Sequence, residues 1–339
     1  MRVALLGRTR ILYDSIERIL QGGDTIVLIG TCPAALEYDI REEDFERKAK
    51  ELGAIFFNDV RINNPEITTL MRSVNADIAI SVNWLTIMKQ QAVSCFKYGI
   101  LNAHCGDLPR YRGNACPNWS ILKGDDYYAI SIHYMVPGEL DSGDILLKKK
   151  YPIEKTTTIT DIYRNMGEEI PVLFCDALNL IRNGNINGEA QSKKPEDSLR
   201  CYPRIPTDSY IDWSQTCDTI LKNIRASAKP FQGAFCYYGD MKLYIYNAES
   251  KSYPAPCYVY PGQVIAINRE NGQVEIAAGD GIIQVQKIYI SNEEYNAADV
   301  LKSTRIRLNY CVQEEIYQLK QQINELKCMV EEMSGKKGM

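Results

Sequence analysis

Histidine is scarce in this 339-residue chain, which contains only His104 and His133. The imidazole is the one side chain whose unperturbed pKa lies near neutrality, so imidazole acid–base chemistry is restricted to these two positions. The chain also lacks an apolar run that is long enough to cross a bilayer, and no secretory signal is evident at its amino terminus. We therefore expect a cytoplasmic protein without a membrane partner.

Paired cysteine motifs are missing too. The 11 cysteines are scattered, and no two are spaced as Cys-x-x-Cys. This pattern argues against a disulfide framework or a zinc site, and it predicts free thiols and no metal centre. Cys105, beside His104, is an alternative nucleophile, although no base is evident for it. The run Gly7-Arg8-Thr9-Arg10 is not a Gly-x-Gly-x-x-Gly loop, which disfavours a dinucleotide site.

The charge balance is slightly acidic, with 39 Lys and Arg against 43 Asp and Glu and a net charge of −4. Residues 36–52 hold seven acidic side chains against four basic ones. This segment can be a solvated helix face, and it would repel phosphates. We therefore expect no nucleic-acid partner.

Short apolar runs alternate with helical patterns in the first half of the chain, which is typical of βαβ units and a mostly parallel, Rossmann-like sheet. We expect strands at 3–6, 25–29, 54–57, 76–81, 99–101, 128–135 and 144–151, and helices at 12–21, 67–74 and 159–181. A chain of this length has room for two packed domains. The expected division is a catalytic domain at 1–184, a polar linker at 185–204, a second domain at 205–308 and a helix at 309–335.

The second domain shows strand patterns at 233–238, 242–246, 262–267, 273–277 and 281–289. Five short strands separated by turns indicate a small, OB-like barrel.

The final segment has a heptad seam. Its apolar residues are spaced 4, 3, 4, 3, 4, 3, and they are Val312, Ile316, Leu319, Ile323, Leu326, Val330 and Met333. Alternate positions are β-branched and leucine-like, which favours a parallel two-stranded coiled coil. We expect a homodimer through this helix, and the alternative is a single amphipathic helix packed on its own domain.

Three polar side chains could form a catalytic cluster. Asn102 and His104 share one face at the C-terminal edge of a predicted strand, where ligands bind in open α/β sheets. Asp141 lies in the loop between the predicted strands 128–135 and 144–151, which could return its carboxylate towards His104. The cluster would combine an oxyanion donor, a proton carrier and a group that raises the carrier's pKa. Asp144 competes with Asp141 for the last role, and His133, within a predicted strand, is expected to be structural.

The motifs carrying these residues resemble the folate-dependent formyltransferases. They are Asn102-x-His104, Leu-Pro-x-Tyr-Arg-Gly at 108–113 and Leu-Asp-x-Gly-Asp at 140–144. Pro203-Arg204 and the run Ile211-Asp212-Trp213-Ser214 resemble the start of the carboxy-terminal domain shared by the methionyl-tRNA and sugar formyltransferases. The resemblance covers residues 1 to 308.

The resemblance implies 10-formyltetrahydrofolate as formyl donor and Asn102, His104 and Asp141 as the catalytic residues. It implies a folate site formed by Trp84, Leu85, Thr86, Ile87, Met88, Asp107, Leu108, Pro109, Pro137, Gly138, Glu139 and Leu140. Residues that could contact the acceptor are Arg110, Tyr111, Arg112, Asn118 and Trp119; the two arginines can equally belong to an ordinary turn. The chain departs from the family pattern at Gly106 and at Asn114, where an arginine is usual.

The nearest pattern within the family is that of the sugar-nucleotide N-formyltransferases, including the domain that acts on UDP-4-amino-4-deoxyarabinose. Arg200-Cys201-Tyr202-Pro203-Arg204 and Pro117-Asn118-Trp119 carry this likeness. The expected acceptor is a dideoxyamino sugar linked to a nucleotide, in surface polysaccharide (lipopolysaccharide, O-antigen) biosynthesis. The alternatives are a methionyl-tRNA formyltransferase, whose tRNA-acting relatives carry a basic insertion where residues 36–52 are acidic, and a catalytically silent scaffold protein.

Overall fold

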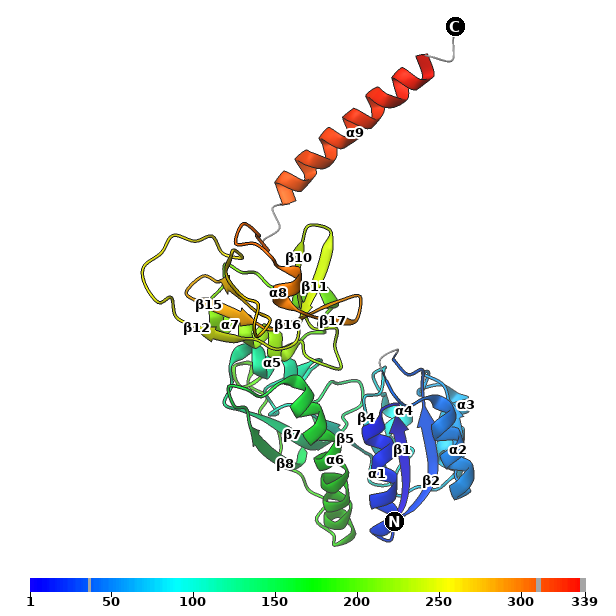
Figure 1. The fold of residues 1–339 in the computed structure, drawn as a ribbon. Helices are drawn as coiled ribbons and strands as arrows, with labels where there is room; N and C mark the ends of the chain where they lie inside the picture. The colour runs from blue at the N-terminus through cyan, green and yellow to red at the C-terminus, as the bar shows by residue number, and fades with distance from the viewer. Residues whose placement is uncertain (36–37, 309–311, 336–339) are drawn as a thin grey trace. The chain divides into compact units, whose positions relative to one another are not determined.

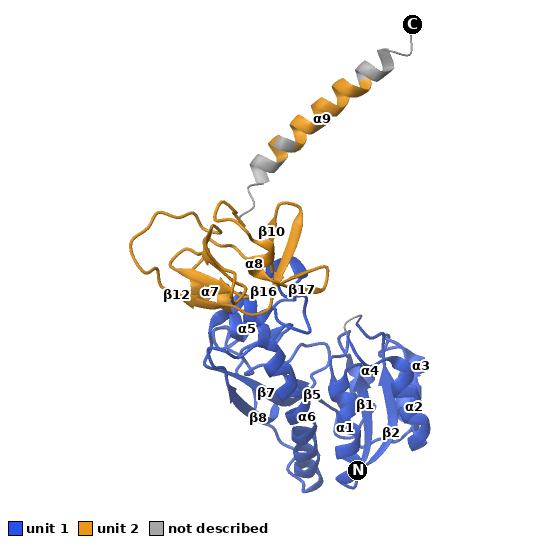
Figure 2. Ribbon diagram, viewed as in Figure 1, with its two compact units in different colours: residues 1–209, 222–234 blue, residues 210–221, 235–339 orange. Residues whose placement is uncertain are grey.

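The computed structural model describes residues 1–35, 38–308 and 312–335. The chain forms two compact units, one made of residues 1–209 and 222–234 and the other of residues 210–221 and 235–339 (Figure 2). Residues 185–204, expected to be a linker, lie in the first unit. Among the described helices none is long and apolar enough to cross a bilayer.

A seven-stranded sheet forms the centre of the first unit, in the order β3-β2-β1-β4-β5-β7-β8 (Figure 1). Its strands are β1 (Arg2–Gly7), β2 (Thr25–Thr31), β3 (Ile55–Asn58), β4 (Ile78–Val82), β5 (Ile100–His104), β7 (Tyr127–Tyr134) and β8 (Ile145–Pro152). The first five strands are parallel, and β7 and β8 are antiparallel to their neighbours. The predicted Rossmann-like, mostly parallel sheet is confirmed.

Helices cover both faces of this sheet because successive side chains of the strands point to opposite sides. In β1, Val3 and Leu5 belong to one apolar cluster and Ala4 and Leu6 to another. The first cluster takes residues from α1 (Arg10–Gln21), α2 (Glu42–Leu52) and α6 (Ile159–Arg182), and the second from α3 (Pro65–Ser73) and α4 (Gln90–Val93). Thr158 caps α6 by accepting a hydrogen bond from the backbone N–H of Asp161.

Short elements complete the first unit. They are β6 (Arg112–Gly113), α5 (Cys116–Lys123), β9 (Arg200–Cys201) and the 3-10 turns η1 (Pro195–Asp197) and η2 (Pro206–Ser209). β6 and β9 pair in parallel, with Arg112 opposite Arg200 and Gly113 opposite Cys201. A segment much further along the chain is thereby fixed next to the loop that follows β5.

The second unit contains two four-stranded antiparallel sheets in the orders β10-β11-β16-β17 and β12-β15-β14-β13. Its elements are β10 (Ala234–Tyr238), β11 (Met241–Ile245), β12 (Glu249–Lys251), β13 (Val264–Asn268), β14 (Gln273–Ala277), β15 (Ile282–Val285), β16 (Lys287–Ile290), β17 (Glu293–Asn296) and α8 (Ala297–Val300). Helix α7 (Cys217–Ala226) spans the boundary between the two units.

The prediction of one strand over 281–289 is wrong. The chain leaves one sheet after Val285 and enters the other at Lys287, so β15 pairs with β12 and β14 while β16 pairs with β11 and β17. The sequence does not indicate β12 and β17, because both strands are short and mostly exposed and therefore show no apolar alternation. The closed, OB-like barrel stays a prediction.

Helix α9 (Val312–Gly335) follows the second unit's sheets in the chain. Its apolar side chains Ile316, Leu319, Ile323, Leu326 and Val330 are between 46% and 64% exposed. Residues 309–311 of the predicted coiled coil, and the side chains of Val312 and Met333, lie outside the described residues. The predicted helix is confirmed, and the coiled coil stays a prediction.

Candidate active site

Asn102 and His104 lie at the C-terminal end of β5, on the same face of the strand. β5 is flanked by β4 on one side and by the antiparallel β7 on the other, where Asn102 is opposite His133. The strand pairing therefore brings both histidines of the chain next to one amide side chain. Their rings are 6.2 Å apart, centre to centre.

Asp141 reaches this cluster from the loop between β7 and β8. Its backbone φ is +50°, a left-handed conformation that Asp adopts more readily than most residues. Gln191 holds the loop by donating hydrogen bonds of 2.9 and 2.7 Å to the carbonyls of Asp141 and Gly143. The carboxylate accepts a 2.9 Å bond from the Gly113 N–H, and its side chain is only 9% exposed.

His104 is buried between two oxygen atoms. Its Nε2 lies 2.6 Å from the Tyr111 carbonyl, which can only accept, so Nε2 carries a proton. Its Nδ1 lies 3.6 Å from Oδ2 of Asp141. Burial lowers the pKa of His104 below its ordinary value of 6.5, and the Asp141 charge opposes this effect only in part. His104 is therefore neutral at pH 7, with a basic Nδ1 beside a carboxylate.

His133 lies beside the same cluster, buried, and the structural role expected of it stays a prediction. Its Nδ1 donates to the Tyr134 carbonyl at 2.9 Å, so in the neutral ring Nε2 accepts from Nδ2 of Asn102 at 3.2 Å. The same Nε2 lies 3.5 Å from Oδ1 of Asp141. His133 thereby orients the Asn102 amide and leaves its second N–H available to a ligand.

The electrostatics of Asp141 follow from these contacts. Burial on its own raises the pKa of the carboxyl. Positive charge on the His104 ring and on the adjacent His133 ring, together with the Gly113 N–H, more than offsets that effect and lowers the pKa of Asp141 to about 2, below its ordinary value of 3.8. Asp141 is therefore ionised throughout the neutral range.

A cavity of about 340 Å³ opens on the cluster. Its lining includes Asn102, His104 and Asp141, together with the segment 84–88 after β4 and the loop residues Glu139 and Leu140. The two walls are joined where the N–H of Gly138 donates to the carbonyl of Met88 at 2.9 Å. Leu85 and Ile87 are 47% and 42% exposed, so the 84–88 wall offers apolar surface to a ligand.

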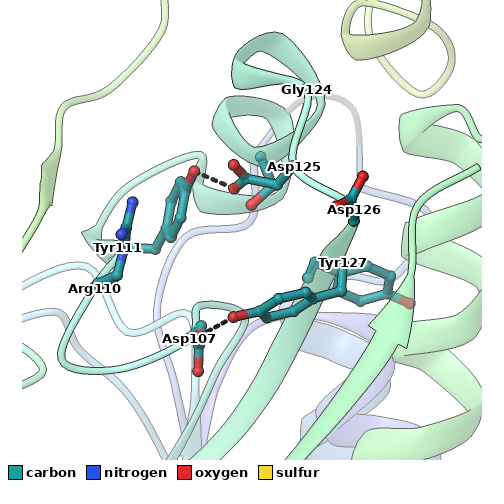
Figure 3. A pocket seen from close by; sticks show the side chains of 9 residues that line it. Asp107, Arg110, Tyr111, Gly124, Asp125, Asp126 and Tyr127 are labelled. Carbon is teal, nitrogen blue, oxygen red and sulfur yellow. Dashed lines mark hydrogen bonds between the residues drawn. The ribbon is translucent and has the colours of Figure 1, made fainter.

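Other residues expected at the folate or acceptor sites lie around two neighbouring cavities. The first cavity, of about 580 Å³, is lined by Asp107, Leu108, Pro109 and Arg110. Asp107 forms an ion pair of 3.0 Å with Lys148 there. The second cavity, of about 300 Å³, is lined by Asp107, Arg110 and Tyr111 among others and is shown in Figure 3.

In this second cavity the Tyr111 hydroxyl donates to Asp125, and the Tyr127 hydroxyl donates to Asp107 at 2.8 Å (Figure 3). The cavity is thus bordered by carboxylates that already accept hydrogen bonds.

Arg112, Asn118 and Trp119 hold the chain in place. Arg112 donates to Oε1 of Gln191 at 2.7 Å, and Trp119 donates to the carbonyl of Tyr202 at 3.0 Å. Asn118 is buried and donates to the carbonyl of Ala226 at 2.8 Å. These three contacts stabilise the loops around the cavity.

The alternative nucleophile loses support. Cys105 is 8% exposed, and burial raises the pKa of its thiol far above neutrality, so the thiolate is not available. Within the part of the chain that the structure describes, no group of three or more His, Cys, Asp or Glu side chains is placed to hold a metal ion.

Comparison with known proteins identifies the family. Residues 1–178 match the formyl transferase family, and residues 205–305 match the family of formyl transferase C-terminal domains. A methionyl-tRNA formyltransferase of Rickettsia africae is 31% identical over 314 residues, which cover 90% of this chain and 98% of that protein. The chain belongs to the formyl transferase family.

Solved structures share the fold. An N-formyltransferase of Helicobacter canadensis, in complex with folinic acid and dTDP-3-aminofucose, has a TM-score of 0.61 and 17% identity over 85% of this chain and 100% of its own. HypX of Aquifex aeolicus, in complex with tetrahydrofolic acid, has a TM-score of 0.57 and 18% identity. That match covers 89% of this chain but spans about half (47%) of the length of HypX.

Proposed function

We propose that this formyltransferase moves a formyl group from 10-formyltetrahydrofolate to the amino group of a nucleotide-linked dideoxyamino sugar, for a surface polysaccharide. The observation that carries the transfer chemistry is the meeting of Asn102, His104 and Asp141 at one cavity. An amide donor, a neutral imidazole and an ionised carboxylate are the groups that acyl transfer to an amine requires. Their presence together argues against a silent scaffold.

The cavity suits the folate donor. Its volume of about 340 Å³ lies within the range of small-molecule sites. Trp84, Leu85 and Ile87 would contact the flat pteridine ring, and the backbone of the 84–88 and 139–140 walls would bind its polar edge. When bound, the folate supplies a formyl carbon activated for attack by an amine.

The protein's own groups each have a separate task. The second N–H of Asn102 donates to the formyl oxygen as negative charge develops there, which is worth about 10²–10³ in rate. Nδ1 of His104 takes the proton that the attacking amine must lose and returns it to the departing nitrogen, a role worth about 10²–10⁴. Asp141 pairs with the imidazolium that exists between these two transfers, and it does so from 3.6 Å.

The charge of the first unit favours a small acceptor over tRNA. Helix α2 carries Glu42, Glu43 and Asp44 in its first turn, and Glu43 is exposed while the other two are half-buried. Negative charge on this face opposes the approach of a polyphosphate backbone. A nucleotide sugar, in contrast, has only to enter the cavity.

Methionyl-tRNA is the second candidate acceptor. The supporting observation is that relatives such as the Rickettsia africae protein, which is named a methionyl-tRNA formyltransferase, match this chain over most of their length. Both candidates share the transfer chemistry, so the choice lies in the surface that the acceptor contacts.

A direct experiment separates them. The full-length protein is incubated with 10-formyltetrahydrofolate and either a panel of uridine, thymidine and guanosine diphosphate amino sugars or methionyl-tRNA. We expect one nucleotide sugar to gain the mass of a CO group and methionyl-tRNA to stay unmodified. Formylation of methionyl-tRNA alone would overturn the proposed acceptor, and no formylation of either would overturn the assignment as a whole.

We also propose that α9 associates two copies of the chain. The supporting observation is its exposed apolar seam at Ile316, Leu319, Ile323, Leu326 and Val330, which water would otherwise surround.

A further inference from the structure

Arg200 stands out among the groups around the active-site cavity. Of the described residues that line the cavity, it is the single lysine or arginine, and the lining also contains the acids Glu139 and Asp141. It comes from β9, within the segment that the sequence indicated to be a linker. Arg200 is exposed, so its guanidinium can meet a ligand without a large desolvation cost.

The backbone places Arg200 accurately. The pairing of β6 with β9 sets it opposite Arg112, and two flanking bonds fix the register: the Arg112 N–H to the carbonyl of Leu199 at 2.9 Å, and the Asn114 N–H to the carbonyl of Cys201 at 3.1 Å. A guanidinium carried by paired strands is better positioned than one on a free loop.

Gly113 links Arg200 to the catalytic cluster. A Cβ at this position would lie 2.3 Å from Nη1 of Arg200, so the guanidinium packs directly against the glycine. The N–H of the same glycine donates to Asp141 at 2.9 Å. Arg200 therefore packs against the residue whose backbone N–H binds the catalytic carboxylate.

Arg200 has no ion-pair partner among the residues that the structure describes. Its guanidinium lies over the ring of Tyr202, 5.4 Å from the centre, and the described residues include no carboxylate in an ion pair with it. Nearby cations already have side-chain partners: Lys148 pairs with Asp107 at 3.0 Å, and Arg112 donates to Gln191. An arginine with a free fork at a ligand cavity is suited to bidentate binding of an oxyanion.

We propose that Arg200 binds a phosphate of the acceptor's nucleoside diphosphate and thereby places the sugar amine at His104. The inference rests on the proposed nucleotide-sugar acceptor and names the residue that selects for it. Asn114 lines the same cavity and carries no charge, so Arg200 supplies the positive charge of this wall from the neighbouring strand. The competing anion is the carboxylate tail of the folate donor, and the experiment separates the two.

The test uses the full-length protein and titration calorimetry with UDP, dTDP and GDP as probes, and separately with 5-formyltetrahydrofolate. The variants are Arg200→Gln and Arg200→Lys, and the matched control is Arg18→Gln, which removes an exposed arginine from α1. Circular dichroism verifies that each variant is folded. We expect Arg200→Gln to weaken binding of the preferred nucleoside diphosphate by about ten- to hundredfold, with Arg200→Lys intermediate, because charge-assisted bonds are lost.

The folate affinity should stay within about twofold in all variants, and Arg18→Gln should match the wild type. Loss of folate affinity with unchanged nucleoside diphosphate binding would overturn the proposal and assign Arg200 to the donor. Unchanged binding of both, or no nucleoside diphosphate binding by the wild type, would overturn it as well. If nucleoside diphosphates bind through Arg200 but no amino sugar is formylated, the proposed reaction fails while the phosphate site stands.

Discussion

Replacing Asp141 by asparagine removes one buried charge and keeps the side chain's shape. The pKa of Asp141 falls from its ordinary value of 3.8 to about 2 in the folded protein. Each pKa unit is worth about 1.4 kcal/mol, so the folded state stabilises the carboxylate by about 2 kcal/mol. Because the pKa is depressed, this stabilisation is present above pH 3.8 and is lost as the pH falls through 2.

We therefore expect Asp141→Asn to lower the free energy of unfolding by up to about 2 kcal/mol at pH 7 and to approach the wild-type value as the pH falls through 2. Activity should respond through His104. The Asp141 charge raises the pKa of His104, so the variant's imidazole is less basic still and its imidazolium has no counter-ion. kcat/KM should fall by about 10²–10⁴, and the acid limb of its pH profile should move to lower pH.

The assays are urea unfolding followed by circular dichroism at pH 7 and near pH 2, and the rate of tetrahydrofolate release against pH. Asp144→Asn is the matched control, because Asp144 is an exposed carboxylate three residues further along the same loop. It should leave both the unfolding free energy and the pH profile unchanged. Equal stability of Asp141→Asn and wild type at pH 7, or an acid limb that stays in place or rises, would refute the reasoning.

Three further predictions concern the other groups. His104→Ala should nearly abolish turnover with an unchanged circular dichroism spectrum, and substantial residual activity would remove His104 from the mechanism. Asn102→Ala should lower kcat by about 10²–10³ with little change in the KM for folate, because its amide acts on developing charge; stopped assays at saturating folate measure this. Ending the chain after residue 308 should reduce the sedimentation coefficient from that of a dimer to that of a monomer, and an unchanged value would exclude α9 as the dimer contact.

The sheet of the first unit was predictable because its strands are buried on both faces and alternate with amphipathic helices. The run at 76–81 and the helix at 159–181 are examples, because their apolar pattern can be recognised without knowing which elements they pack against. The position of Asn102 and His104 on one face of a strand follows from the two-residue period of a strand alone. The position of Asp141 needed the family resemblance, because a loop's return path is not encoded in local spacing.

The rest depended on tertiary pairing. His133 joins the cluster only because β7 runs antiparallel to β5 in the register that sets it opposite Asn102. Gln191 and Arg200 come from a polar segment whose composition resembles a linker, and the two-residue pairing of β9 with β6 leaves no periodic pattern. The division of 281–289 between two sheets is a similar case, because apolar alternation identifies a strand but not the strand it pairs with.

The central claim is that Asn102, His104 and Asp141 transfer a formyl group from folate to a nucleotide-linked amine. Mass spectrometry of the nucleotide sugar after incubation with 10-formyltetrahydrofolate tests it most directly, with wild type and His104→Ala side by side. The account predicts a product heavier by one CO group with the wild type and none with the variant. A formylated product of equal yield from both proteins, or formylation confined to methionyl-tRNA, would contradict it.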